Sequence, residues 1–182
     1  MVEVRVVEAD SRLRRFVVRL ARRLFGEEAY WVEAGFRWEP RWVRTLVLLV
    51  DDKPAGFNQV YVWPCCGLML GVHHYIGVEP GLQGRGYGKV LLASGEEVLV
   101  EMGAEVFAAT LRAGNVRSRR MLESMGYRVY SWEELERLLG DEVVDELGYA
   151  TGGYTDDLVA LKDASEPWRD PIELLRRRVV RS

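Results

Sequence analysis

The sequence predicts a mixed α/β protein in which helices flank one central sheet. Apolar runs with strand character alternate with amphipathic helical segments along most of the chain. A glycine-rich turn joins one such strand directly to a helix at residues 79–88. The length of 182 residues suits one domain. We expect residues 1–163 to form that domain and residues 164–182 to be a C-terminal helical extension of it.

The N-terminal region predicts a strand followed by a helix. Residues 2–6 alternate valine with charged side chains, the period of a half-buried strand. Asp10 or Ser11 can cap a helix that Gly26 closes. Its apolar stripe is Leu13, Phe16, Val17, Leu20 and Leu24. Arginines at 12, 15, 19, 22 and 23 lie mostly on the other face, and we expect a solvated face paired with acidic side chains rather than a phosphate site.

The region of residues 45–78 predicts strands and an unusual connector. Thr45–Val50 and Ala55–Trp63 form an antiparallel pair that Pro64 ends, and Val72–Val78 is the central strand. The connector between Pro64 and Val72 contains Cys65 and Cys66, and His73 and His74 follow it. Adjacent cysteines lack the two-residue spacing of structural zinc sites, so we expect no metal. The thiols are then reduced, or they cross-link subunits in an oxidised preparation.

The second half of the chain continues the alternation of helices and strands. Gly126 stands where it can cap the helix that Asn115 leads. Glycines and aromatics at residues 148–154 predict a flexible loop, and the helix after Pro171 is expected to serve packing or dimerisation. The other predicted elements are helix Gly86–Met102, strand Val106–Leu111, a strand from Tyr127, helix Trp132–Leu139 and strand Leu158–Lys162.

Composition excludes several classes of function. The net charge of −3 carries no general nucleic-acid signature. We find no apolar run of transmembrane length, and charged residues occupy the N-terminus, so we expect a cytoplasmic protein without a membrane partner. Lysine, asparagine and glutamine are scarce. Low amide content suggests a thermophilic source as a hypothesis, whereas a GC-rich genome explains the arginine bias equally well.

The stretch from Tyr75 to Lys89 predicts an anion site. Gly84, Gly86 and Gly88 let a ligand approach the backbone, and a helix that begins near Gly86 directs unpaired N–H groups at it. Together with Arg85 and Lys89, these groups suit a diphosphate. The spacing of the glycines fits neither the Rossmann fingerprint nor a P-loop.

Two blocks resemble the GNAT superfamily of CoA-dependent N-acyltransferases. Gln83-x-x-Gly86-x-Gly88 is similar to the family signature, and residues 115–127 are similar to its second block, an asparagine-led helix followed by Gly-aromatic. The resemblance implies a mixed, mostly antiparallel sheet. It also implies transfer of an acetyl group from acetyl-CoA, as co-substrate, to a primary amine of a small molecule or protein.

The resemblance also assigns site residues. The diphosphate would lie on the amides of residues 83–89, the pantetheine arm along residues 76–78, and Asn115 and Ser118 would touch the cofactor. Aligned with arylalkylamine N-acetyltransferases, His74 would act as the base, and strand alternation places it on one face with residues 72, 76 and 78, opposite His73 and Tyr75. The cofactor-binding set is Ile76, Gly77, Val78, Gln83, Gly84, Arg85, Gly86, Tyr87, Gly88, Lys89, Asn115 and Ser118.

Departures from the family pattern leave alternatives open. Leu122 stands where many members have a tyrosine, so Tyr154, Tyr149 or water would protonate the thiolate. The missing tyrosine also fits a CoA-binding regulatory protein without transferase activity, and a nucleic-acid-binding module is a third alternative. Residues 25–42 are rich in aromatic side chains that either line one wall of the acceptor site or pack as core.

Overall fold

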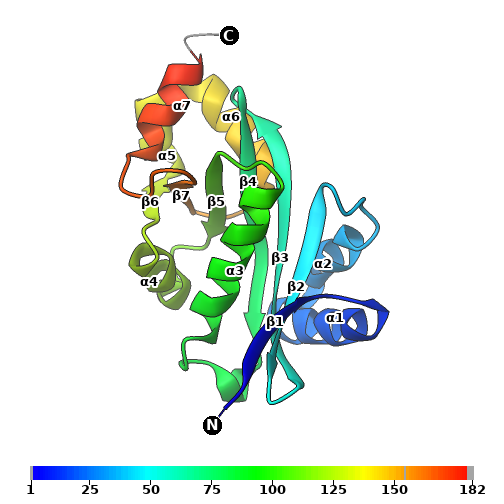
Figure 1. The fold of residues 1–182 in the computed structure, drawn as a ribbon. Coiled ribbons are helices and arrows are strands. Elements are labelled where there is room, and N and C mark those ends of the chain that lie inside the picture. The colour runs from blue at the N-terminus through cyan, green and yellow to red at the C-terminus, as the bar shows by residue number, and fades with distance from the viewer. Residues whose placement is uncertain (1, 154, 180–182) are drawn as a thin grey trace. The chain divides into compact units, whose positions relative to one another are not determined.

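The computed structural model describes residues 2–153 and 155–179 (Figure 1). This part of the chain contains seven strands and seven helices, with short 3₁₀ turns at Gly26–Glu28 and Pro80–Leu82. The strands are β1 (Val4–Glu8), β2 (Val43–Val50), β3 (Lys53–Cys65), β4 (Leu68–Val78), β5 (Val106–Leu111), β6 (Arg128–Ser131) and β7 (Leu158–Asp163). The helices are α1 (Ser11–Phe25), α2 (Ala29–Gly35), α3 (Tyr87–Glu101), α4 (Val116–Ser124), α5 (Trp132–Leu139), α6 (Asp141–Thr151) and α7 (Pro171–Val179).

One seven-stranded sheet has the order β1-β2-β3-β4-β5-β7-β6. β4 and β5 run parallel, with Val72 opposite Ala108. The registers of β1 with β2, β2 with β3, β5 with β7 and β6 with β7 are antiparallel. The predicted mixed, mostly antiparallel sheet with flanking helices is confirmed.

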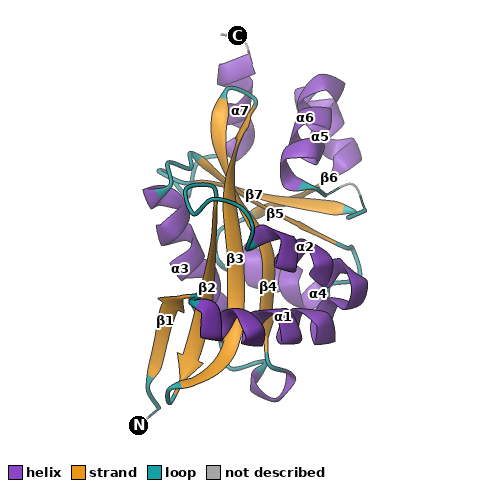
Figure 2. Cartoon of the chain, turned by 90° about the vertical axis from the view of Figure 1, so that its right-hand side faces the viewer, coloured by secondary structure: helices purple, strands orange, loops and turns teal. Residues whose placement is uncertain are grey.

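The chain forms two compact units, and the first comprises residues up to 61 together with residues 73–98. Its strands are covered on both faces. Val47 of β2 packs with Phe16 of α1 and Phe57 of β3. Its neighbour Leu48 packs in a separate cluster with Leu91 of α3. Successive residues of β2 therefore face the α1 and α2 layer and the α3 layer, and these helices are labelled in Figure 2.

The second unit comprises residues 62–72 and 99–182. In it α6 packs on β5, α7 packs on β7, and α5 contacts both α6 and α7. Ile172 and Leu175 of α7 are buried, so this helix is anchored by its apolar face. In the described part of the chain no helix is long and apolar enough to cross a membrane.

Two local predictions were wrong, and one helix was not predicted. β3 continues through Pro64 to Cys65 and β4 begins at Leu68, so a two-residue turn replaces the expected connector between Pro64 and Val72. Helix α2 occupies part of the aromatic segment. Helix α6 extends to Thr151 and includes residues 148–151 of the expected loop, because Gly152 with φ of 64° ends it in the left-handed conformation. Residue 154 lies outside the described residues.

Candidate functional site

The glycine-rich turn has the backbone that the sequence predicted. Gly84 and Gly86 have φ of 80° and 85°, and a Cβ added at either would meet no atom within 4 Å. Glycine is therefore required by the backbone conformation and not by crowding from the protein. α3 starts at Tyr87, directly after this turn. The result is an exposed helix N-terminus approached through open space, which suits an anionic group.

Donors around the turn are available to a ligand. Among the described residues, the amides of Gly84 and Gly86 make no hydrogen bond within the protein, and Arg85 and Lys89 form no ion pair. The sequence predicts that the Gln83 amide contacts the diphosphate. In the structure this N–H donates to Pro80 O, and the side-chain Nε2 donates to Val78 O at 3.0 Å. Gln83 thus ties the turn to the end of β4.

The predicted cofactor-binding residues of β4 and the start of α3 also build the core. Ile76, Val78 and Tyr87 pack against the cluster of Leu48, Ala55 and Leu91. Their side chains therefore hold the strand end and the helix start in place, which leaves backbone groups to contact a ligand. The contacts of residues 76–78 and 83–89 with CoA stay predictions.

His74 lies in a hydrogen-bond network centred on Gln59 of β3. The distance from His74 Nδ1 to Gln59 Oε1 is 3.1 Å. Gln59 is fully buried, and its Nε2 donates to Val32 O of α2 at 3.0 Å and to Thr45 Oγ1 of β2 at 3.1 Å. Because both donors of the amide face other partners, its oxygen faces the imidazole. Nδ1 must then carry the proton, and Nε2 has a free lone pair.

The electrostatic setting keeps His74 neutral. Burial lowers its pKa from the ordinary 6.5 to about 4. Nε2 makes no hydrogen bond to any residue that the structure describes. The rings of Tyr61 and Tyr75 stand beside it, with centroids at 5.3 and 4.5 Å. Burial and the neighbouring Tyr75 raise the pKa of Tyr61, which keeps its hydroxyl protonated at neutral pH.

The predicted alternation of side chains along β4 was wrong in part. His73 faces α3, where Asn58 Nδ2 lies 3.0 Å from its Nδ1 and a Cβ on Gly95 would collide with its ring. Ile76 and Val78 face the same layer. Tyr75 instead packs with Phe25 and Phe57 in the α1 layer, on the His74 side. Two successive side chains on one face are what a β-bulge produces, and bulges of this kind re-aim side chains next to active sites.

The aromatic side chains of residues 25–42 divide between core packing and exposed positions. Phe25 and Phe36 pack against the α1 core. Tyr30, Trp31 and Trp38 are 59%, 57% and 48% exposed, and the rings of Tyr30 and Trp31 contact each other at 5.2 Å. α2 is connected to the His74 network through Val32 O. The exposed rings of Tyr30 and Trp31 therefore provide an apolar surface on α2.

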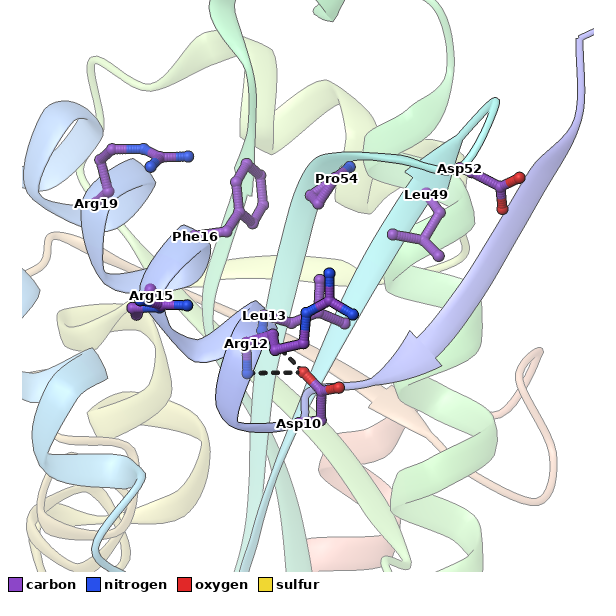
Figure 3. A pocket seen from close by; sticks show the side chains of 9 residues that line it. All are labelled: Asp10, Arg12, Leu13, Arg15, Phe16, Arg19, Leu49, Asp52 and Pro54. Atoms are coloured by element: carbon purple, nitrogen blue, oxygen red, sulfur yellow. Dashed lines mark hydrogen bonds between the residues drawn. The ribbon is translucent and has the colours of Figure 1, made fainter.

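A pocket of about 590 Å³ lies beside α1 (Figure 3). It is lined by Asp10, Arg12, Leu13, Arg15, Phe16, Arg19, Leu49, Asp52 and Pro54. The expectation that the arginine stripe is paired holds for Arg22 with Glu33 and Arg23 with Glu79. In the described residues, Arg12, Arg15 and Arg19 form no ion pair.

The second unit contains the remaining predicted residues. Asn115 caps α4, where its Oδ1 accepts from Ser118 N at 3.2 Å, so both have a structural role and their contact with CoA stays a prediction. Leu122 is a buried core residue. Of the two alternative proton donors, Tyr149 is 65% exposed and packs on Trp63, and Tyr154 lies outside the described residues.

The sequence matches the Acetyltransferase (GNAT) family over residues 11–127. No curated protein sequence matches the chain. Many solved structures share its fold, including the following three.

A GNAT family acetyltransferase from Staphylococcus aureus Mu50 has a TM-score of 0.66 at 8% identity, over 90% of this chain and 100% of that one. The PaiA N-acetyltransferase of Thermoplasma acidophilum, in complex with coenzyme A, has a TM-score of 0.62 at 11% identity, over 88% and 99%. A glucosamine N-acetyltransferase region of a fungal multi-domain β-N-acetylglucosaminidase has a TM-score of 0.62 at 16% identity, over 71% of this chain but 17% of that longer one.

Proposed function

Because the chain belongs to the GNAT acetyltransferase family, we propose that it transfers an acetyl group from acetyl-CoA to a primary amine of a small molecule or a protein. The observation that carries the proposal is the turn at Gly84 and Gly86, whose positive φ angles leave open space at the N-terminus of α3. Arg85 and Lys89 add positive charge there, so the turn suits a diphosphate. The test is release of free CoA thiol from acetyl-CoA with a panel of amines.

His74 is the proton acceptor in this proposal. The amine nitrogen attacks the thioester carbonyl, the C–N bond forms, the C–S bond breaks, and the nitrogen loses a proton. Nε2 can accept that proton because the hydrogen bond from Nδ1 to Gln59 Oε1 leaves its lone pair available. With a pKa of about 4, His74 is a weak base. His74 therefore takes the proton only as the attack on the thioester makes the amine nitrogen acidic. The amine substrate must bind in its neutral form, because so weak a base cannot deprotonate an ammonium ion beforehand.

The proton needed by the departing thiolate has a separate source. Leu122 is buried, and its aliphatic side chain has no acidic proton to donate. A hydroxyl elsewhere or water must therefore supply the proton. The proposal keeps Tyr149, Tyr154 and water as sources. Substitution of each tyrosine by phenylalanine, with turnover measured for acceptors of different basicity, distinguishes a protein acid from water.

Aromatic side chains beside His74 and on α2 support an acceptor whose non-reacting part is apolar or aromatic. Tyr61 and Tyr75 contact the imidazole, and Tyr30 and Trp31 are exposed on α2. Such rings bind apolar groups and stabilise cations that lie over their faces. Arylalkylamines and peptides with an aromatic first residue are the acceptors to test first, with an aliphatic polyamine as the comparison.

A regulatory protein that binds acetyl-CoA without transfer is the second candidate, favoured by the buried Leu122. It predicts measurable acetyl-CoA affinity and no thiol release with any amine in the panel. Thiol release that depends on the amine excludes it.

A further inference from the structure

The turn between β3 and β4 has a backbone that cysteine does not favour. Cys66 and Gly67 form the two-residue loop, and their φ angles are 55° and 70°. Hairpin loops with two positive φ angles strongly prefer asparagine or aspartate followed by glycine. Gly67 fits this preference and Cys66 does not. Turn formation alone therefore does not explain a cysteine at this position.

The same turn brings two sulfur atoms together. Along a regular strand successive side chains point to opposite faces. Here the Sγ atoms of Cys65 and Cys66 lie 2.9 Å apart, and both residues are buried. Neither can cross-link subunits in this conformation without exposure of the turn. The two thiol groups therefore form a buried pair on the same side of the turn.

A carboxylate from a distant part of the chain completes the group. Glu146 of α6 accepts a hydrogen bond from the Cys66 amide through Oε1, at 2.6 Å. One ligand atom from each of Cys65, Cys66 and Glu146 lies within 4.8 Å of the other two. Cys66 Sγ also donates to Val143 O of α6 at 3.9 Å. The hairpin and the helix are thus already joined around the two thiols.

We propose that Cys65, Cys66 and Glu146 bind one thiophilic divalent cation of the Zn²⁺ or Cd²⁺ type. Binding replaces the two thiol protons: the cation, two thiols and one carboxylate give a complex with two thiolates and one carboxylate, and two protons are released. Thiolates and carboxylates are both ligands of zinc, and three protein ligands leave one position for water. Glu146 Oε2 can bind while Oε1 keeps its bond to the Cys66 amide, which orients the carboxylate.

The geometry needs a small adjustment. Two sulfurs about 2.3 Å from a tetrahedral zinc ion lie about 3.7 Å from each other. The present separation is 2.9 Å, so the thiols must move apart by less than their own radius, which side-chain rotation supplies. The two-residue spacing of known zinc motifs did not predict this site, because the third ligand stands 80 residues after Cys66 and only the packing of α6 brings it near.

The experiment titrates the full-length protein with Cd²⁺ alone, after reduction and confirmation of two free thiols. We expect one equivalent to bind, with thiolate-to-cadmium absorbance in the ultraviolet and with a rise in melting temperature. Cys66→Asn supplies the preferred turn residue, so it should fold at least as well and lose roughly a hundredfold in affinity. Cys65→Ser should lose affinity similarly.

Glu146→Gln tests the third ligand, and Glu142→Gln, an exposed acidic residue on the same helix, is its control. The first should weaken Cd²⁺ binding by about tenfold or more and the second should leave it unchanged. Wild-type affinity in Cys66→Asn or in Glu146→Gln overturns the proposal. Absence of thiolate absorbance in wild type that holds two free thiols overturns it as well. None of these readouts depends on acetyl transfer.

Discussion

The amide oxygen of Gln59 lies 3.1 Å from Nδ1 of His74, on the adjacent strand. Gln59 is fully buried, and hydrogen bonds to Val32 O and Thr45 Oγ1 fix the direction of its amide. A histidine with Nδ1 protonated in this way presents Nε2 as an acceptor. Gln59 is therefore a positioning residue for the proposed base, and predictions about His74 extend to its partners.

Replacement of His74 should lower turnover. His74→Ala should reduce it by roughly a hundredfold with an amine acceptor, the loss expected for a general base, and leave acetyl-CoA affinity nearly unchanged. Because its pKa is about 4, the wild-type profile should show no inflection from His74 between pH 5 and 8. Steady-state kinetics and calorimetry measure these quantities. Full activity in the variant at pH 7 would exclude His74 as the base.

His74 should also make stability depend on pH. Its pKa is about 4 in the folded protein and about 6.5 when unfolded, so the unfolded chain binds more protons between these values. The free energy of unfolding should fall as pH decreases from 6.5 to 4, by on the order of 3 kcal/mol in total. Denaturant unfolding at several pH values should show this contribution in wild type and not in His74→Gln. Equal slopes in both proteins would contradict the lowered pKa.

Only glycine is expected to fit at position 35 of α2, because the side chain of Gln59 occupies the space that a Cβ would need. A Cβ at position 35 would lie 2.6 to 2.7 Å from the amide atoms of Gln59. Alanine favours helices over glycine by about 1 kcal/mol, but here the collision with a fully buried side chain should outweigh it. Gly35→Ala should lower both melting temperature and turnover. A stabilised, fully active Gly35→Ala would refute the proposed positioning.

The glycine turn should determine acetyl-CoA affinity. Gly86→Val places a branched side chain at φ of 85°, in the space proposed for the diphosphate, and should weaken binding at least about tenfold. Lys89→Glu places a negative charge in the first turn of α3, which favours the helix but repels a diphosphate. Calorimetry should therefore show weaker binding without loss of stability in Lys89→Glu. Unchanged affinity in both folded variants would refute this location.

Tyr127 is expected to be structural. It is buried, and the Lys162 Nζ lies 5.3 Å from its ring centroid. Tyr127→Phe keeps the ring and should retain turnover within a few-fold. A large loss of turnover with unchanged melting temperature would instead identify its hydroxyl as the missing acid.

Local backbone requirements explain what could be predicted for the glycine-rich turn. Glycine is the residue that adopts positive φ without cost, so its spacing before an apolar helix identified residues 84–88 from the sequence. The N-cap of α1 was predicted as Asp10 or Ser11, and Asp10 is the residue that caps it; such a cap is visible in a sequence because it bonds within three residues of itself. Alternation of valine with charged side chains likewise predicted β1, and apolar runs bounded by turn residues predicted β2 and β3.

The sequence by itself determined the family, the sheet and the glycine-rich turn before α3, because these depend on residues close together in the chain. The tertiary structure decided which side chains meet. Alternation placed Tyr75 opposite His74, whereas packing against Phe25 and Phe57 brings both to one face. Glu146 reaches Cys66, and Gln59 reaches His74, across strands and helices distant in sequence. Spacing cannot predict such contacts, because they depend on how whole elements pack.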